Sequence, residues 1–143
     1  MTSAPGSAAE DRALTDAVAQ ASFAMTALLT RVGAAHDLSL TQVRVLAILR
    51  NHEPTMAQLA DHLGLDRSTV SGLVDRAAKR GLVERVSNDE DRRSSRVRLT
   101  AAGRRLAEDG ADEISEAVAA MAVGLDVDER RTLRDLLARM RPA

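Results

Sequence analysis

Several residue types are scarce in this chain, and each scarcity excludes a class of site. The 143 residues include no cysteine, tryptophan or tyrosine, and a single phenylalanine. Without cysteine the chain forms no disulfide and no thiolate metal site, and no thiol senses oxidants. No apolar run approaches the roughly 18 residues of a membrane helix, and no basic segment before an apolar block marks a signal peptide. We therefore expect a cytoplasmic protein without membrane contact.

Sequence patterns typical of enzymes are also missing. The chain has no glycine-rich phosphate loop, no nucleophile elbow, and no histidine and carboxylate paired at a diagnostic spacing. The three histidines, His36, His52 and His62, do not share the i, i+4 spacing of a helical ligand pair. We expect neither catalysis nor a bound metal or cofactor.

The formal net charge of −1 conceals an uneven distribution of charge. Residues 67–105 hold eleven Arg or Lys against five Asp or Glu, a local balance of +6 that leaves −7 for the rest of the chain. A basic segment on an acidic body is expected where one face meets a polyanion such as DNA. A solvated charged surface would give the same pattern, so charge alone does not decide between them.

Long helical patterns occupy both ends of the chain. Within residues 10–37, apolar residues recur at steps of three and four and form one stripe. A second long pattern follows Thr100 and is broken near Gly124. A central core cannot cover both stripes, so residues 10–37 and 104–143 are expected to form a helical dimerisation lobe. Residues 1–9, rich in Ser, Ala, Pro and Gly, are expected to be a disordered tail.

The centre of the chain reads as a helix-turn-helix followed by a β-hairpin. Capping-box spacings open three helices: Ser39 with Gln42, Thr55 with Gln58, and Asp126 with Glu129. Gly64 ends one short helix, Asp66 caps the next over residues 67–80, and Gly81 closes it. Two short strands are predicted at residues 82–86 and 95–100. The fold class is therefore mainly α with a small β-hairpin wing, and the helix-turn-helix and the hairpin together form a central domain over residues 38–103.

The second helix of this motif has a polar outer face. The helical period places Val70, Leu73, Val74, Ala77 and Ala78 on the inner face. The outer face then carries Arg67, Ser68, Ser71, Gly72, Asp75, Arg76 and Lys79. Such a helix fits the major groove of B-form DNA, and its first turn favours phosphate. A capped surface helix with solvated charges is the simpler alternative.

The loop between the predicted strands, NDEDRRSS, has acids before its arginines. Beside a helix in the major groove, the hairpin tip would lie over the backbone or the minor groove, which attracts arginine. Arg92 is predicted at the tip, supported by Arg93, Arg96 and Arg98 through phosphate contacts or local ion pairs. Two acids are expected to orient the wing: Asp91 by binding an arginine in the loop, and Asp75 by pairing with Arg93.

Three stretches resemble the MarR-type winged-helix transcription regulators. They are LTQVRVLAIL at 40–49, LADHLGLDRSTVSGLVDRAAKRGLVER at 59–85, and NDEDRRSSRVRLTAAG at 88–103. The resemblance implies a homodimer with interleaved terminal helices and two winged lobes that bind a palindromic operator in double-stranded DNA. It places Ser68, Thr69, Ser71 and Arg76 on or beside the groove-reading helix and Arg92 in the minor groove. Relatives often have an arginine at the position that Gly72 occupies in this chain.

The resemblance also implies regulation by a small molecule. Such proteins are commonly repressors released from DNA by a small aromatic or anionic effector between the dimer and winged lobes. Candidate lining residues are Phe23, Met25, His36, Arg44 and Met56. Repression and activation both stay open, as does a winged-helix module that binds only protein. The effector, operator and target genes cannot be read from the sequence.

Overall fold

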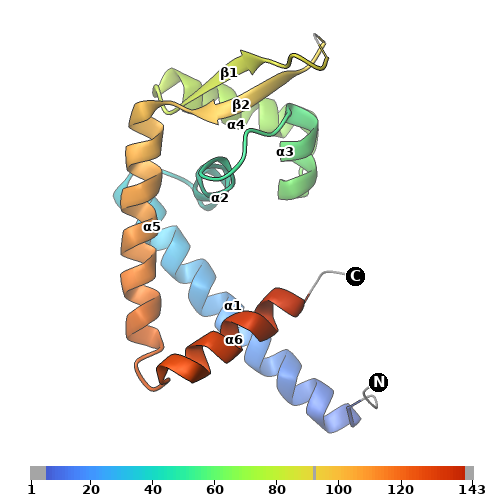
Figure 1. The fold of residues 1–143 in the computed structure, drawn as a ribbon, viewed down its shortest axis with the longest axis vertical. Helices are drawn as coiled ribbons and strands as arrows, with labels where there is room; N and C mark the ends of the chain where they lie inside the picture. Colours follow the sequence, from blue (N-terminus) through green and yellow to red (C-terminus); the bar gives the residue numbers. More distant parts are fainter. Residues whose placement is uncertain (1–5, 92, 141–143) are drawn as a thin grey trace.

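The structure, a computed structural model, describes residues 6–91 and 93–140. This part contains six helices and two strands: α1 (Ala8–Ala35), α2 (Leu40–Leu49), α3 (Met56–Leu63), α4 (Arg67–Lys79), β1 (Val83–Ser87), β2 (Ser95–Leu99), α5 (Ala101–Met121) and α6 (Val127–Arg139). In Figure 1, the hairpin lies with α3 and α4 at one end of the molecule, and α5 leads from it towards α1 and α6 at the other end. The mainly helical fold class with a two-stranded wing is confirmed.

The helices begin at capping residues. The three predicted capping boxes are present, and in the first the Ser39 hydroxyl accepts from the Gln42 N–H at 3.2 Å. A fourth box, between Ser7 and Glu10, was not predicted from the sequence. It starts α1 at Ala8, two residues before the expected start. Ala8 and Ala9 are therefore helical, whereas residues 1–5 of the expected tail lie outside the described residues.

The winged half of the molecule is built on one aliphatic core. Leu59, Val70, Val74 and Val97 are fully buried and come from α3, α4 and β2. Burying each such side chain contributes about 1.5–3 kcal/mol. Ala78, predicted on the inner face of α4, is exposed because it lies at the edge of the buried stripe. The core also includes Val45 of α2.

The wing is a two-stranded antiparallel hairpin joined to the helical core. Val83 pairs with Leu99 and Ser87 with Ser95. Side chains alternate along β2, since Val97 and Leu99 are buried while Arg98 is exposed. The strands span 83–87 and 95–99 rather than 82–86 and 95–100, because Thr100 leaves the sheet to cap α5.

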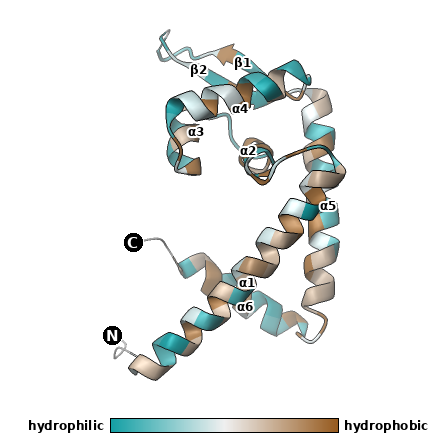
Figure 2. Ribbon diagram, turned by 180° about the vertical axis from the view of Figure 1, so that it is seen from behind, coloured by the Kyte–Doolittle hydropathy of each residue, from teal (hydrophilic) through white to brown (hydrophobic). Residues whose placement is uncertain are grey.

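The other half carries apolar side chains that this chain leaves uncovered. No residue of α6 is buried, and Leu133, Leu136 and Leu137 are each about half exposed. Figure 2 shows hydrophobic residues along α1, α5 and α6, and α1 exposes Phe23. Removing such surface from water is favourable. These helices therefore present an extensive surface for association.

Close contact between α5 and the start of the wing requires Gly103. A methyl group at this position would overlap the backbone of Leu82. We expect Gly103→Ala to lower the free energy of unfolding by about 1–3 kcal/mol or more, because packed backbone has to move. Gly110→Ala on the same helix is the control, since its methyl group meets nothing within 4 Å and should stabilise by about 0.5–1 kcal/mol. Urea unfolding measures both, and equal stabilities would contradict the packing argument.

Candidate nucleic-acid interface

The outer face of α4 is positioned by the turn that precedes it. Gly64 ends α3 in the left-handed conformation (φ 67°), and the Leu65 N–H donates to the Ala60 carbonyl at 3.1 Å. Asp66 then caps α4. With its inner side chains in the core, the helix exposes Arg67, Ser68, Thr69, Asp75, Arg76 and Lys79, while Ser71 and Gly72 are half-buried.

Asp66 occupies the N-terminus of α4 with its own negative charge. Its carboxylate accepts from the Ser68 hydroxyl at 2.6 Å, and from the Thr69 hydroxyl and backbone N–H at 2.8 Å each. These hydrogen bonds, led by the one from Ser68, hold the pKa of Asp66 well below its usual range. Donors of this first turn, expected to favour phosphate, are therefore already engaged by an internal carboxylate.

An ion pair connects the wing to α4. Nη2 of Arg85, on β1, lies 2.8 Å from Oδ1 of Asp75 and also donates to the Ser71 hydroxyl at 3.3 Å. The predicted pairing of Asp75 with Arg93 is therefore wrong in its partner. Strand alternation could have identified Arg85 as the partner of Asp75. It places Arg85 on the same side of β1 as the buried Val83. The pair is partly exposed and mainly fixes orientation.

Asp91 and Asn88 build the turn of the loop. Asp91 Oδ1 accepts from the Arg93 backbone N–H at 2.9 Å and so orders the loop. Within residues 6–91 and 93–140, no guanidinium bonds to Asp91. Asn88, 6% exposed, donates through Nδ2 to the Ser94 hydroxyl at 2.8 Å and accepts from the Glu90 N–H at 3.3 Å. Arg92, predicted at the tip, lies outside the described residues.

Two of the predicted wing arginines contact the protein itself. Arg96 donates to the Glu53 carbonyl at 3.0 Å. Nε of Arg98 lies 2.7 Å from Oε1 of Glu84, and this hydrogen bond raises the pKa of Arg98. The sequence left open whether Arg96 and Arg98 contact phosphates or form local ion pairs. These contacts favour local support of the hairpin.

Four cationic side chains near the hairpin have no hydrogen-bond or ion-pair partner within the described residues. They are Arg67, Arg76 and Lys79 on α4 and Arg93 in the loop. All four are exposed. The hairpin and α4 therefore form one basic surface, in which internal pairs fix the geometry and other cations are available to an anion.

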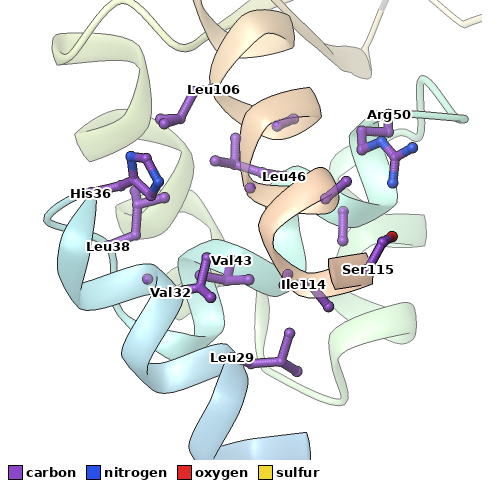
Figure 3. A pocket seen from close by; sticks show the side chains of 15 residues that line it. Leu29, Val32, His36, Leu38, Val43, Leu46, Arg50, Leu106, Ile114 and Ser115 are labelled. Carbon is purple, nitrogen blue, oxygen red and sulfur yellow. The ribbon is translucent and has the colours of Figure 1, made fainter. Parts of the chain in front are cut away.

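A cavity of about 280 Å³ lies between α1, α2 and α5. Its walls are largely aliphatic, with Val43, Leu46 and Ile114 among the side chains in Figure 3. His36 lies on one side of the view, and its Nε2 is 2.8 Å from Oε1 of Glu113. Arg50 lies on the other side, and its buried Nε has no hydrogen-bond partner within the described residues. The cavity is thus apolar with polar groups at its margins.

The five residues predicted around an effector do not gather at this cavity. His36 lines it. Phe23 is 72% exposed on α1, Met25 is half-buried on the same helix, and Arg44 is exposed on α2. Met56 packs against the winged core. The cavity walls come largely from small and aliphatic residues, which sequence inspection does not distinguish from ordinary core.

Two other kinds of feature are absent from the described residues. No three His, Asp or Glu side chains gather there as ligands of a metal ion would. No helix in residues 6–91 or 93–140 is long and apolar enough to cross a membrane.

Comparison with known sequences places the central part of the chain in a family. A model of the MarR family matches residues 36–94. The uncharacterized HTH-type transcriptional regulator YfiV of Bacillus subtilis is 42% identical over 65 residues, covering 45% of this chain and 41% of the relative. The HTH-type transcriptional regulator FarR of Neisseria gonorrhoeae is 30% identical over 100 residues, 69% of this chain and 68% of the relative. The chain spans 41, 64 and 54% of the length of three curated relatives that it matches.

Solved structures extend the similarity over almost the whole chain. NadR in complex with 4-hydroxyphenylacetate has a TM-score of 0.76 at 26% identity, covering 96% of this chain and 94% of NadR. A mutant of MarR from E. coli complexed with operator DNA has a TM-score of 0.72 at 26% identity. The match covers 93% of this chain and 96% of the MarR chain. These matches confirm the resemblance to transcriptional regulators. The chain belongs to the MarR family of winged helix-turn-helix transcriptional regulators.

Proposed function

We propose that this protein is a sequence-specific regulator that binds duplex DNA through α4 and the wing. The observation that carries the proposal is the Arg85 bridge to Asp75 and Ser71, which holds the hairpin against α4 beside unpaired cations. A rigid cationic surface neutralises phosphates and releases their counterions. The mutant MarR from E. coli, which has the same fold, was solved with operator DNA.

In this proposal α4 enters the major groove. Ser68, Thr69, Ser71 and Gly72 lie at the closest approach to the bases, and Arg67 and Lys79 contact phosphates. Arg92 and Arg93 extend the contact from the wing to the minor groove, and Arg96 and Arg98 support the hairpin. Asp75 and Asp91 fix the orientation of the wing.

The proposed DNA-binding unit is a homodimer on a palindromic operator. Support comes from the apolar surface of α1, α5 and α6, including Leu137, which this chain leaves uncovered. We assign residues 10–37 and 104–143 to the dimerisation lobe and residues 38–103 to the DNA-binding domain. A twofold axis would present two copies of α4 about 34 Å apart, one turn of B-form DNA.

We further propose that the protein is a repressor released by a small aromatic or anionic effector in the cavity. Support comes from the cavity's position between the lobe helices α1 and α5 and the domain helix α2. Arg80, which caps the C-terminus of α4, donates to the carbonyl oxygens of Asp37 and His36 at 2.8 and 3.0 Å. A ligand beside His36 would thus act on a segment that holds α4. NadR was solved with 4-hydroxyphenylacetate.

Salt dependence tests DNA binding against a module that binds only protein. Affinity for an operator duplex should fall steeply between about 50 and 200 mM salt, because several phosphates are neutralised. Arg93→Ala should weaken binding and reduce the salt slope by about 1, with an unchanged melting temperature because its side chain is exposed. Arg31→Ala on the exposed face of α1 is the control. Fluorescence anisotropy measures both, and a flat salt response would refute the proposal.

A charge in the uncovered apolar surface tests the dimer. We expect Leu137→Glu to shift the protein towards monomer, because burying an unpaired carboxylate is unfavourable. Sedimentation velocity measures the assembly, and operator affinity should fall with it. Ala138→Glu, which by the helical period lies outside the stripe of Leu133, Leu136 and Leu137, introduces the same charge and should leave the assembly unchanged. A Leu137→Glu protein that stays dimeric would place the interface elsewhere.

Filling the cavity tests the effector site. Aromatic carboxylates, including 4-hydroxyphenylacetate, would be screened for release of the protein from operator DNA. We expect Ala111→Leu to abolish release while DNA binding persists, because Ala111 lines the cavity. Ala119→Leu, at an exposed position of the same helix, should respond like the unmodified protein. A compound that releases both variants equally well would act at another site.

A further inference from the structure

The middle of the outer face of α4 has a gap in its side chains. The helical period places Ser68, Gly72, Asp75 and Lys79 along the line farthest from the buried stripe. Gly72 lies near the centre of this line and has no side chain. A groove floor can therefore approach the helix backbone most closely at Gly72.

The guanidinium of Arg76 lies over this gap. A methyl group built on Gly72 would be 3.3 Å from Nη1 of Arg76 and within 4 Å of no other neighbouring side chain of the described part. Helical side chains lean towards the N-terminus and cover the residue four positions earlier. Arg76 projects from the flank of the face, but its charged end thus reaches the centre.

Most other polar groups on this face are held by internal contacts. The hydroxyls of Ser68 and Thr69 donate to Asp66. Asp75 and Ser71 both contact Arg85. The guanidinium of Arg76 has no such partner among the described residues, so all of its donors are available for a base.

We propose that Arg76 is the residue that reads a guanine in each half-site, with its guanidinium in the space that Gly72 leaves open. The planar fork of an arginine matches the O6 and N7 acceptors that guanine presents in the major groove. Gly72 contributes by having no side chain, because any larger residue there would displace the guanidinium or hold the helix away. This inference rests on the proposed binding of α4 in the major groove.

The other two unpaired cations of α4 are placed less well for a base. Arg67 is the first residue of the helix and lies at the edge of the face, about 110° from the central line by the helical period. Lys79 is the last residue, and its ammonium is a point charge without the two-pronged geometry of arginine. Both are suited to phosphate contacts, which position the protein without reading sequence.

Selection of duplexes from a randomised pool tests the assignment. The unmodified protein should enrich a motif with one guanine per half-site, preferred roughly 5- to 150-fold over other bases. Arg76→Lys keeps the charge but removes the fork, so it should retain DNA binding and its salt slope while losing the guanine preference. Arg31→Lys, the same change on the exposed face of α1 outside the basic surface, should select the original motif.

A second variant tests the role of the gap. Gly72→Leu leaves Arg76 in place but fills the space, so the guanine preference should fall although the cation is present. Melting temperatures verify that each variant is folded, since both positions are on the surface face of α4. If Arg76→Lys selects the same guanine as the unmodified protein, the assignment is overturned. If the unmodified protein enriches no duplex, the proposed function itself fails, and the two failures are distinguishable.

Discussion

The junction between the wing and α5 is the constraint on which the relative placement of the two halves depends. The Thr100 hydroxyl donates to the Gly81 carbonyl, and the Thr100 N–H donates to the Leu82 carbonyl at 3.0 Å. Gly103 lets α5 approach the same backbone. The end of α4, the start of β1 and the start of α5 therefore meet at one point, and a shift there would reorient the basic surface relative to the lobe.

Acidic residues on the winged half fix the geometry of its elements. Asp66, Asp75, Asp91 and Glu84 each engage a nearby donor and thereby fix α4, the hairpin or its turn. Such exposed contacts contribute little stability individually. They nevertheless hold α4 and the hairpin in one geometry before any ligand binds. Preorganisation of this kind lowers the ordering entropy that binding would otherwise cost.

Local signals account for most of what could be predicted. The capping residues Thr55, Asp66 and Thr100 and the turn residue Gly64 act through neighbours within a few positions, so sequence spacing reveals them. Long-range partners were harder: Asp75 was expected to bind Arg93, but it binds Arg85. Both arginines satisfy the chemistry, and only the path of the hairpin brings one of them within 2.8 Å.

The sequence by itself determined the family, the order of the helices and strands, and the basic segment on an acidic chain. These properties follow from periodicity, capping and composition, which are local or additive. Tertiary structure alone decided which cations stay unpaired, where Arg76 lies over Gly72, and that aliphatic walls from α1, α2 and α5 enclose a cavity. Such features depend on distances between atoms that packing sets, and sequence separation does not encode those distances.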